Sequence, residues 1–247
     1  MLVLFLFLIF LCWGSFLNVV AHRSIAGVPF LKKRSMCPNC QNLIPWYYNI
    51  PVFSFLVLRG KCACCKKGIS WLYPFIEVLT AVFMTPLVFY VHGPFQFLAY
   101  FVFFSALIVS TRTDFQAMVI PQIFTLWLVP FALLFAFYGL LRITFLWSVL
   151  GAVFGYGILW LVAALFKFFT KKEGLGVGDM ELLCLIGAFM GPLCVWTTIF
   201  VASISGLVYS LFIFRVCPKK IPFGPFLALG AVLYFFFQDF FIAFLLG

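Results

Sequence analysis

Long apolar runs separated by short polar segments dominate the hydrophobic pattern of this chain. A helix that crosses a bilayer needs about 20 mostly apolar residues, with about 17 as the practical minimum. Because unpaired backbone groups are costly in lipid, each run is predicted to be a helix. The pattern therefore predicts an all-α polytopic membrane protein with about eight transmembrane helices. Their expected spans are 1–21, 71–91, 95–111, 120–140, 143–166, 180–196, 198–214 and 225–246.

The sixth and seventh runs follow each other without a polar loop. Together, residues 180–214 make 35 positions, which is too long for one ordinary span, and Gly191-Pro192 offers a break. Treating the stretch as one span would also place Arg215, Lys219 and Lys220 on the opposite side from most other basic residues. Two spans are therefore expected here.

The basic residues orient the spans, because Lys and Arg collect in the cytoplasmic loops of membrane proteins. With both termini outside, the cytoplasmic segments 22–70, 112–119, 167–179 and 215–224 hold 15 of the 16 Lys and Arg residues, leaving only Arg142 outside. The first run should be a retained span, since no basic residue precedes it and no small-residue cleavage site follows it.

Composition agrees with this assignment. Hydrophobic residues make up 66% of the chain and charged residues 9%, compared with about 25% charged in soluble domains. The net charge of +10 comes from clusters between apolar runs and forms no basic face on a soluble domain. Membrane lipids are therefore expected partners and nucleic acid is not.

The chain is expected to form two regions. Residues 1–92 contain the first span, a long cytoplasmic loop rich in cysteine and the second span, whereas residues 93–247 contain six spans joined by short turns. Gly151 and Gly155 form a small-xxx-small pair in the fifth span, which is typical of close helix packing.

Four cysteines in the long loop have the spacing of a zinc site: Cys37 and Cys40 form one CxxC turn, and Cys62 and Cys65 form another. Two such turns can surround a tetrahedral zinc ion, and Cys64 is then the surplus thiol. Four thiolate ligands leave no open coordination position, so the zinc would be structural. Unbound or redox-active thiols and an iron–sulfur cluster are the alternatives. The neighbouring Trp46, Tyr47 and Tyr48 suit the lipid headgroup layer.

Acids in or beside a bilayer are costly, which makes each of the six a candidate for function. Glu173 lies among lysines and is expected to be solvated. Glu77 and Asp239 lie within spans and are expected to make polar contacts between helices, and Glu181 lies beside Asp179 and could support it.

Asp114 and Asp179 are the candidate catalytic pair, because Asp114 follows the third span and Asp179 precedes the sixth, at the same cytoplasmic face. Pairing with Arg112 or nearby lysines is the structural alternative. The sequence Gly176-Val177-Gly178-Asp179 favours a catalytic role, since glycines let an extended substrate approach and permit positive φ. Two carboxylates about 3 Å apart share a proton, so one can activate water while the other donates to a scissile carbonyl oxygen.

With these motifs in order, the sequence resembles the type IV prepilin peptidase family of bacterial GxGD aspartic proteases. In the first region the matching elements are Gly14-Ser15-Phe16-Leu17-Asn18-Val19-Val20, Cys37-Pro38-Asn39-Cys40, Trp46-Tyr47-Tyr48-Asn49-Ile50-Pro51, Leu58-Arg59-Gly60-Lys61-Cys62 with Cys65, Ile69-Ser70, and Tyr73-Pro74 with Glu77. In the second region they are Asp114 with Pro121, the GxGD motif at 176–179, and Pro222-Phe223-Gly224-Pro225-Phe226. The chain departs from the family at Leu72, where an Arg is common, and at Gln122, where an acid is common.

The resemblance implies an aspartic endopeptidase in the bacterial inner membrane. Such enzymes remove the basic leader of prepilins or pseudopilins at the cytoplasmic face, and many then methylate the new N-terminus with S-adenosylmethionine. Residues 93–247 would be the peptidase domain. No glycine-rich nucleotide loop is evident, so no residue is assigned to the methyl donor.

Two other classes of protein fit part of the pattern. A proton- or ion-coupled transporter would use paired aspartates, but near the bilayer midplane. A scaffold protein could dock partners through the cysteine loop, but this would leave the GxGD motif unexplained.

Overall fold

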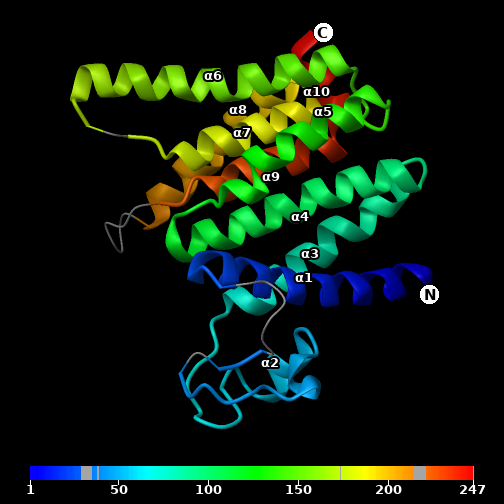
Figure 1. The fold of residues 1–247 in the computed structure, drawn as a ribbon, viewed down its shortest axis with the longest axis vertical. Coiled ribbons are helices and arrows are strands. Elements are labelled where there is room, and N and C mark those ends of the chain that lie inside the picture. The colour runs from blue at the N-terminus through cyan, green and yellow to red at the C-terminus, as the bar shows by residue number, and fades with distance from the viewer. Residues whose placement is uncertain (29–34, 38, 173, 214–220, 247) are drawn as a thin grey trace. The chain divides into compact units, whose positions relative to one another are not determined.

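A computed structural model describes residues 1–247 except 29–34, 38, 173, 214–220 and 247. The described residues form helices, turns and loops, with no β-strand among them (Figure 1). The chain divides into two compact units, Met1–His92 and Gly93–Gly247. Several basic residues used to orient the spans (Lys32, Lys33, Arg34, Arg215, Lys219 and Lys220) and Glu173, expected to be solvated, lie outside the described part of the chain.

Five of the described helices are long and apolar enough to cross a bilayer. In the first unit they are α1 (Leu2–Ala26) and α3 (Leu72–Tyr90), and in the second α4 (Pro94–Ala117), α6 (Phe145–Thr170) and α8 (Pro192–Ile213). An all-α membrane protein with several spans is therefore confirmed. The count of eight is not, because the other three apolar runs form shorter helices.

These shorter helices arise where the backbone interrupts an apolar run. The run 120–140 begins with two 3-10 turns, η2 (Gln122–Phe124) and η3 (Leu126–Leu128), before α5 (Val129–Phe137). The last run divides at Phe237 into α9 (Gly224–Phe236) and α10 (Gln238–Leu246). Helix α7 (Val177–Met190) has 14 residues, or about 21 Å at 1.5 Å per residue, which is shorter than a hydrocarbon core of about 30 Å.

The predicted break at Gly191-Pro192 is confirmed. Helix α7 ends at Met190, Gly191 has φ +82°, and α8 begins with Pro192. Proline suits this place because the first helical position needs no intrahelical N–H bond. The predicted boundary between the two runs, at 196–198, was several residues too late.

The first unit is built on α1 and α3, which lie against each other along their lengths. A side chain at Gly14 would come within 2.8 Å of the Cα of Glu77 and 2.9 Å of Thr80, so glycine is required for this approach. Farther along, the Asn18 side-chain amide donates a hydrogen bond of 3.1 Å to the Tyr73 carbonyl. The loop between these helices contains η1 (Trp46–Asn49) and α2 (Phe53–Val57).

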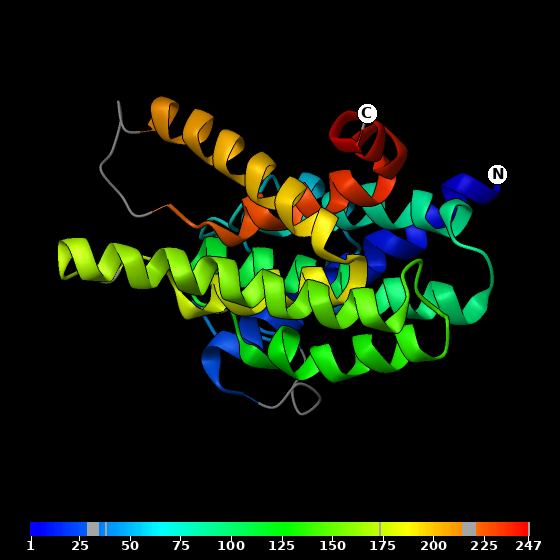
Figure 2. The ribbon, with the colours of Figure 1, turned by 90° about the horizontal axis from the view of Figure 1, so that it is seen from above.

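Helix α7 is the centre of the second unit, and every residue from Met180 to Met190 is buried. Helix α6 lies along it (Figure 2), and the packing role predicted for Gly151 and Gly155 is confirmed: side chains at these positions would meet the carbonyl oxygens of Gly187 and Leu183. The Ser148 hydroxyl adds a hydrogen bond of 2.6 Å to the Ala188 carbonyl.

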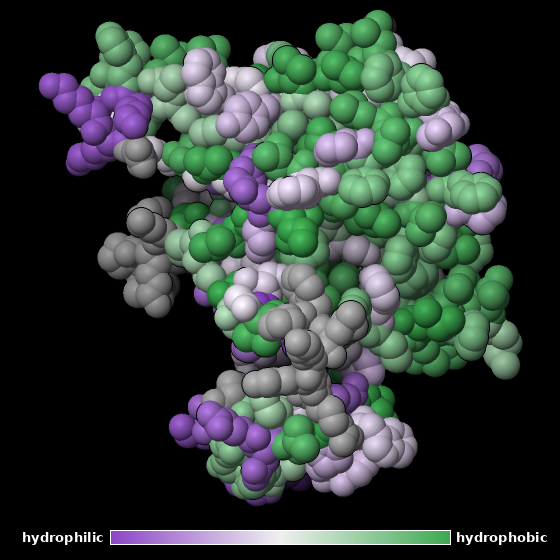
Figure 3. All heavy atoms as spheres, viewed as in Figure 1, coloured by the Kyte–Doolittle hydropathy of each residue, from purple (hydrophilic) through white to green (hydrophobic). Residues whose placement is uncertain are grey.

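The outward side chains of the second unit are largely hydrophobic (Figure 3). On α6 the exposed residues include Leu146, Val153, Trp160 and Leu161, which are 52–67% exposed. A soluble protein rarely exposes a continuous apolar surface of this extent, whereas lipid tails would cover it.

Candidate active site

Asp114 lies in the last turn of α4, where it is only 5% exposed. The helix continues beyond the predicted end of the span at residue 111: α4 runs to Ala117 and ends at Met118, whose φ of +53° closes the helix. The Gly224 backbone N–H donates a hydrogen bond of 2.9 Å to Asp114 Oδ2. One carboxylate oxygen is thereby fixed to the start of α9.

Asp179 lies in the first turn of α7, just before the apolar run of that helix. Burial of its carboxyl group and, secondly, repulsion from Asp114 raise its pKa from 3.8 to about 7, although a backbone hydrogen bond from Gly176 acts in the opposite direction. The electrostatic coupling shows that the two carboxyl groups, 65 positions apart in the sequence, are neighbours in the second unit. Ionisation of both carboxyl groups at once is therefore unfavourable.

The two glycines of the GxGD motif have different surroundings. Gly176, with φ −76°, is the N-cap of α7, and among the described residues a Cβ there would meet only Asp179 Oδ2, at 3.3 Å. A Cβ at Gly178 would lie 2.9 Å from the Cβ of Ile120. Neither glycine has a positive φ, so the expected conformational reason was wrong. Gly178 is required by close packing against Ile120, because its place in the helix leaves no room for a side chain.

The side chain of Ile120 packs where three elements of the second unit meet. It belongs to the segment that follows α4, it packs against Gly178 of α7, and its Cδ1 lies 3.0 Å from the Cβ position of Gly224. The same Cβ position at Gly224 is 2.9 Å from Asp114 Oδ2. The side chain of Ile120 therefore contacts the backbone on which both aspartates depend.

Glu181, expected as a possible support for Asp179, forms a polar cluster with two residues of the segment that follows α4. It is 3% exposed. The Gln122 side-chain amide donates to Glu181 Oε1 at 2.7 Å, and the Thr125 hydroxyl donates to Oε2 at 3.1 Å. Sequence reasoning missed Gln122 and Thr125 as its partners. The sequence did contain one sign that position 122 has a particular partner, because Gln122 stands where the family commonly has an acid.

The structure brings together Cys37, Cys40, Cys62 and Cys65 in the first unit. Their sulfur atoms all lie within 4.8 Å of one another, and the Sγ atoms of Cys37 and Cys65 are 3.8 Å apart. Tetrahedral zinc with bonds of about 2.3 Å holds its sulfur ligands about 3.8 Å apart, so the four residues fit such an ion. Cys64 is outside this cluster, and its Sγ atom accepts a hydrogen bond from the Asn42 amide at 2.8 Å.

The two CxxC turns have the same backbone geometry. In each, the N–H of the first cysteine donates to the carbonyl five residues later, at Asn42 and at Lys67. The residue four positions after that cysteine has a φ of +57° in both cases, at Gln41 and at Lys66. Isolated β-bridges, Met36–Leu43 and Lys61–Gly68, close the turns. Matching turns of this kind present paired sulfur atoms to one ion.

Glu77 connects the same loop to the helices of the first unit. It is 6% exposed, and its carboxylate accepts a hydrogen bond of 2.8 Å from the Val52 backbone N–H and another from the Ser15 side chain. The expected contact between helices is thus confirmed, since Ser15 belongs to α1. Val52 has a φ of +59°, which is unusual for a β-branched residue, so the contact with Glu77 holds a strained turn.

Asp239 was expected inside a span, and the structure does not confirm this. Because the last apolar run divides at Phe237, Asp239 lies exposed in the first turn of α10. A carboxylate in this position interacts favourably with the helix dipole.

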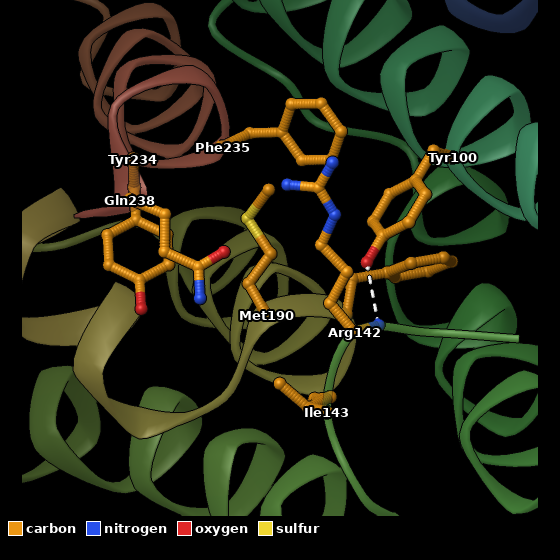
Figure 4. A pocket seen from close by; sticks show the side chains of 8 residues that line it. Tyr100, Arg142, Ile143, Met190, Tyr234, Phe235 and Gln238 are labelled. Carbon is orange, nitrogen blue, oxygen red and sulfur yellow. Dashed lines mark hydrogen bonds between the residues drawn. The ribbon is translucent and has the colours of Figure 1, made fainter. Parts of the chain in front are cut away.

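A separate small pocket, with a cavity volume of about 10 Å³, lies elsewhere in the second unit (Figure 4). The Arg142 guanidinium lies over the Phe235 ring at 4.8 Å, and the Arg142 backbone N–H donates to the Tyr100 hydroxyl at 3.1 Å. Tyr100 precedes Asp114 by 14 residues on α4, or about 21 Å along the helix axis. This cavity is therefore remote from the aspartate pair.

The fold and the site together define a class: an integral membrane protein with a coupled aspartate pair in its helical second unit and a four-cysteine cluster in its first. Comparison with known proteins identifies the family. Residues 101–211 match the type IV leader peptidase family, and residues 8–91 match the bacterial peptidase A24 N-terminal domain.

Relatives match nearly the whole chain. Prepilin leader peptidase/N-methyltransferases from Dichelobacter nodosus (34% identical), Pectobacterium carotovorum (35%) and Neisseria gonorrhoeae (35%) align with 89–92% of this chain and 87% of their own lengths. The chain therefore belongs to the type IV leader peptidase family. No solved structure matches it. These comparisons do not support the alternative of an ion-coupled transporter.

Proposed function

We propose that this protein is a membrane aspartic endopeptidase that removes the leader peptide from prepilins or pseudopilins and N-methylates the new N-terminus. Family membership and the names of the relatives support this substrate class and both activities. The single observation that carries the proteolytic mechanism is the coupling between Asp114 and Asp179.

Different surroundings give the two aspartates different parts in hydrolysis. The Gly224 N–H can only donate, so the Asp114 oxygen that it contacts must accept, which suits an ionised carboxylate. Asp179, with its pKa raised to about 7, is the member that carries the shared proton. Asp114 would take a proton from the attacking water while Asp179 donates to the scissile carbonyl oxygen. The proton on the pair is then available for the leaving amine.

The GxGD motif offers a place for the substrate. Gly176 is exposed, and in the described part of the chain the Asp179 carboxylate alone lies within 4 Å of the position where its Cβ would be. An extended peptide can approach the acid over this glycine, whereas Gly178 is occupied by its contact with Ile120. Gly176 is thus the better candidate for substrate approach.

The distribution of basic residues supports a bacterial inner-membrane topology in which both termini lie outside and the aspartates face the cytoplasm. Eight crossings satisfy this distribution, with α5, α7 and α9 as short or partial spans. Zinc at Cys37, Cys40, Cys62 and Cys65 would cross-link the two CxxC turns and stabilise the loop of the first unit. In methylation, S-adenosylmethionine would supply the methyl group.

The experiment that tests the peptidase mechanism is cleavage of a prepilin by detergent-solubilised protein, followed by gel shift. Asp114→Asn and Asp179→Asn are nearly isosteric but cannot exchange the proton. Each should lower hydrolysis by several orders of magnitude while the protein stays folded. Glu173→Gln, the control, should cleave normally. Full cleavage by either Asn variant would refute the aspartic mechanism.

A further inference from the structure

Glu181, Gln122 and Thr125 join the two chain segments that carry the aspartates. Glu181 follows Asp179 by two residues on α7, and Gln122 follows Asp114 by eight, at the start of η2. Both oxygens of the Glu181 carboxylate accept a hydrogen bond from the η2–η3 segment, at 2.7 Å and 3.1 Å. A buried carboxylate with two donors forms strong bonds, because the surrounding dielectric is low.

The position of Ile120 depends on this junction. Ile120 lies between the end of α4 and Gln122, in a segment tied to α7 through Glu181. Its side chain fills the slot between Gly178 and Gly224. Gly224 in turn donates its N–H to Asp114. A shift of the segment would therefore move the contacts beside Asp179 and beside Asp114 together.

The amide at position 122 is matched to the acid at position 181. The family commonly has an acid after the proline, but here Gln122 supplies an N–H donor to Glu181 Oε1. A second carboxylate at position 122 would leave Glu181 Oε1 without this donor, and the like charges would repel in a buried place. The departure at Gln122 and the burial of Glu181 thus have one physical explanation.

We propose that Glu181, with Gln122 and Thr125 as its donors, is a positioning residue that sets the geometry of the aspartate pair. This rests on the proposed peptidase function. Glu181 acts through Ile120 and the η2–η3 segment, because the two hydrogen bonds that its carboxylate accepts come from that segment. A misplacement of about 1 Å in catalytic groups can reduce a rate about 100-fold, so a small change in this segment is enough to affect the reaction.

An exchange of the two side chains tests the proposal. Gln122→Glu places two carboxylates opposite each other, and Glu181→Gln alone keeps one amide–carbonyl bond. The double variant Gln122→Glu/Glu181→Gln restores one acid and one amide with their places reversed. Steady-state cleavage of a prepilin peptide should show kcat reduced about 10- to 100-fold in Gln122→Glu, with KM nearly unchanged. The double variant should return kcat to within about threefold of the wild-type value, because the hydrogen bond is restored.

Ser148→Ala is the matched control, because it removes a buried hydrogen bond of α7 to α6 near the other end of the helix. It should lower thermal stability and leave kcat unchanged. If Gln122→Glu does not fold, Thr125→Val removes one donor and should lower kcat about three- to tenfold. A merely structural cluster would lower the melting temperature in these variants without a kcat effect beyond that of Ser148→Ala.

The outcomes separate this inference from the proposed function. Absence of cleavage by the wild-type protein, or full cleavage by Asp179→Asn, would count against the peptidase mechanism itself. If wild-type protein cleaves and Asp179→Asn does not, but folded Gln122→Glu or Thr125→Val keeps the wild-type kcat, only the positioning role is overturned. Failure of the folded double variant to recover activity would also overturn it.

Discussion

Gly224 donates its backbone N–H to the carboxylate of Asp114 at 2.9 Å, across 110 positions of sequence. The contact brings the start of α9 to the end of α4, and the Pro222-Phe223-Gly224-Pro225-Phe226 motif thereby gains a place in the site. Glycine serves this contact by its size, because the position of its missing side chain is occupied by Asp114 and Ile120. A motif without any ionisable residue thus contributes a hydrogen-bond donor and a close surface to the aspartate pair.

Replacement of this glycine should therefore impair catalysis. In Gly224→Ala the new methyl group would lie 2.9 Å from Asp114 Oδ2 and 3.0 Å from Ile120 Cδ1, so the carboxylate or the segment must move. We expect kcat for prepilin cleavage to fall about 10- to 100-fold with the protein still folded.

Gly157→Ala provides the control for this substitution. Gly157 lies within α6, and no neighbouring atom of the described residues is within 4 Å of its Cβ position. Alanine there should raise stability by about 0.5–1 kcal/mol, because glycine is a poor helix former, and leave the rate unchanged. Equal rates for Gly224→Ala and wild type would mean that the close contact is not needed for hydrolysis.

The pH dependence of cleavage should reflect the shared proton. With the pKa of Asp179 near 7, the pair keeps its proton below about pH 7 and loses it as the pH rises further. We therefore expect kcat to fall on the alkaline side, above about pH 7. Asp239→Asn, which changes an exposed acid outside the site, should keep the same alkaline limb. A rate that still rises up to pH 9 would contradict this assignment.

The stability of the folded protein should also depend on the ionisation of Asp179, and this contribution should fall as the pH rises. The pKa of an aspartate in the unfolded chain is near 3.8, below the value of about 7 for Asp179 in the folded protein. Between these values the folded state binds a proton that the unfolded state has released, so this contribution to stability is lost as the pH rises. Thermal unfolding of Asp179→Asn should lack this part of the pH dependence, and an unchanged pH dependence in the variant would argue against it.

Much of the molecule could be predicted from its sequence, because lipid imposes a simple pattern. Long helices follow from apolar runs, and the four cysteines follow from their spacing. The end of α4 was not predicted because Arg112 and Asp114 are charged and suggest a loop, whereas they are buried inside the second unit. Hydropathy reports the preference for lipid over water and does not describe a helix surrounded by protein.

The same limit applies to the shorter helices and to the polar contacts. Helix α7 is apolar because protein surrounds it, so its sequence has the same appearance as that of a lipid-facing span. Gln122 and Glu181 are 59 positions apart, and no periodicity in the sequence connects them. The candidate aspartates themselves could be found from the sequence, because charge is rare in this chain and the GxGD motif is distinctive.

The proposed topology predicts opposite locations for two loops of the second unit. Reporter fusions after Arg142 should be active outside the cytoplasm, and fusions after Lys172 should be active inside it, because the basic residues follow this division. A fusion after Lys67, in the cysteine loop, should report the same side as Lys172. Accessibility of the cysteine loop from outside intact cells would overturn this orientation.

Metal binding is the last prediction, and the two matching CxxC turns are its basis. Purified protein should contain about one zinc ion per chain, measured by mass spectrometry of the metal. Serine at Cys37, Cys40, Cys62 or Cys65 removes a thiolate ligand, so each variant should lose the metal and make the loop more sensitive to protease. Chelation of the wild-type protein should produce the same sensitivity.

Cys64→Ser is the matched control, because Cys64 is adjacent to a proposed ligand but lies outside the sulfur cluster. Its Sγ atom accepts a hydrogen bond from Asn42, and a serine hydroxyl can accept one in its place. This variant should therefore keep its zinc and its resistance to protease. If Cys64→Ser lost the metal as completely as Cys65→Ser, the assignment of the four ligands would be wrong, and unchanged metal content in all four ligand variants would exclude the site altogether.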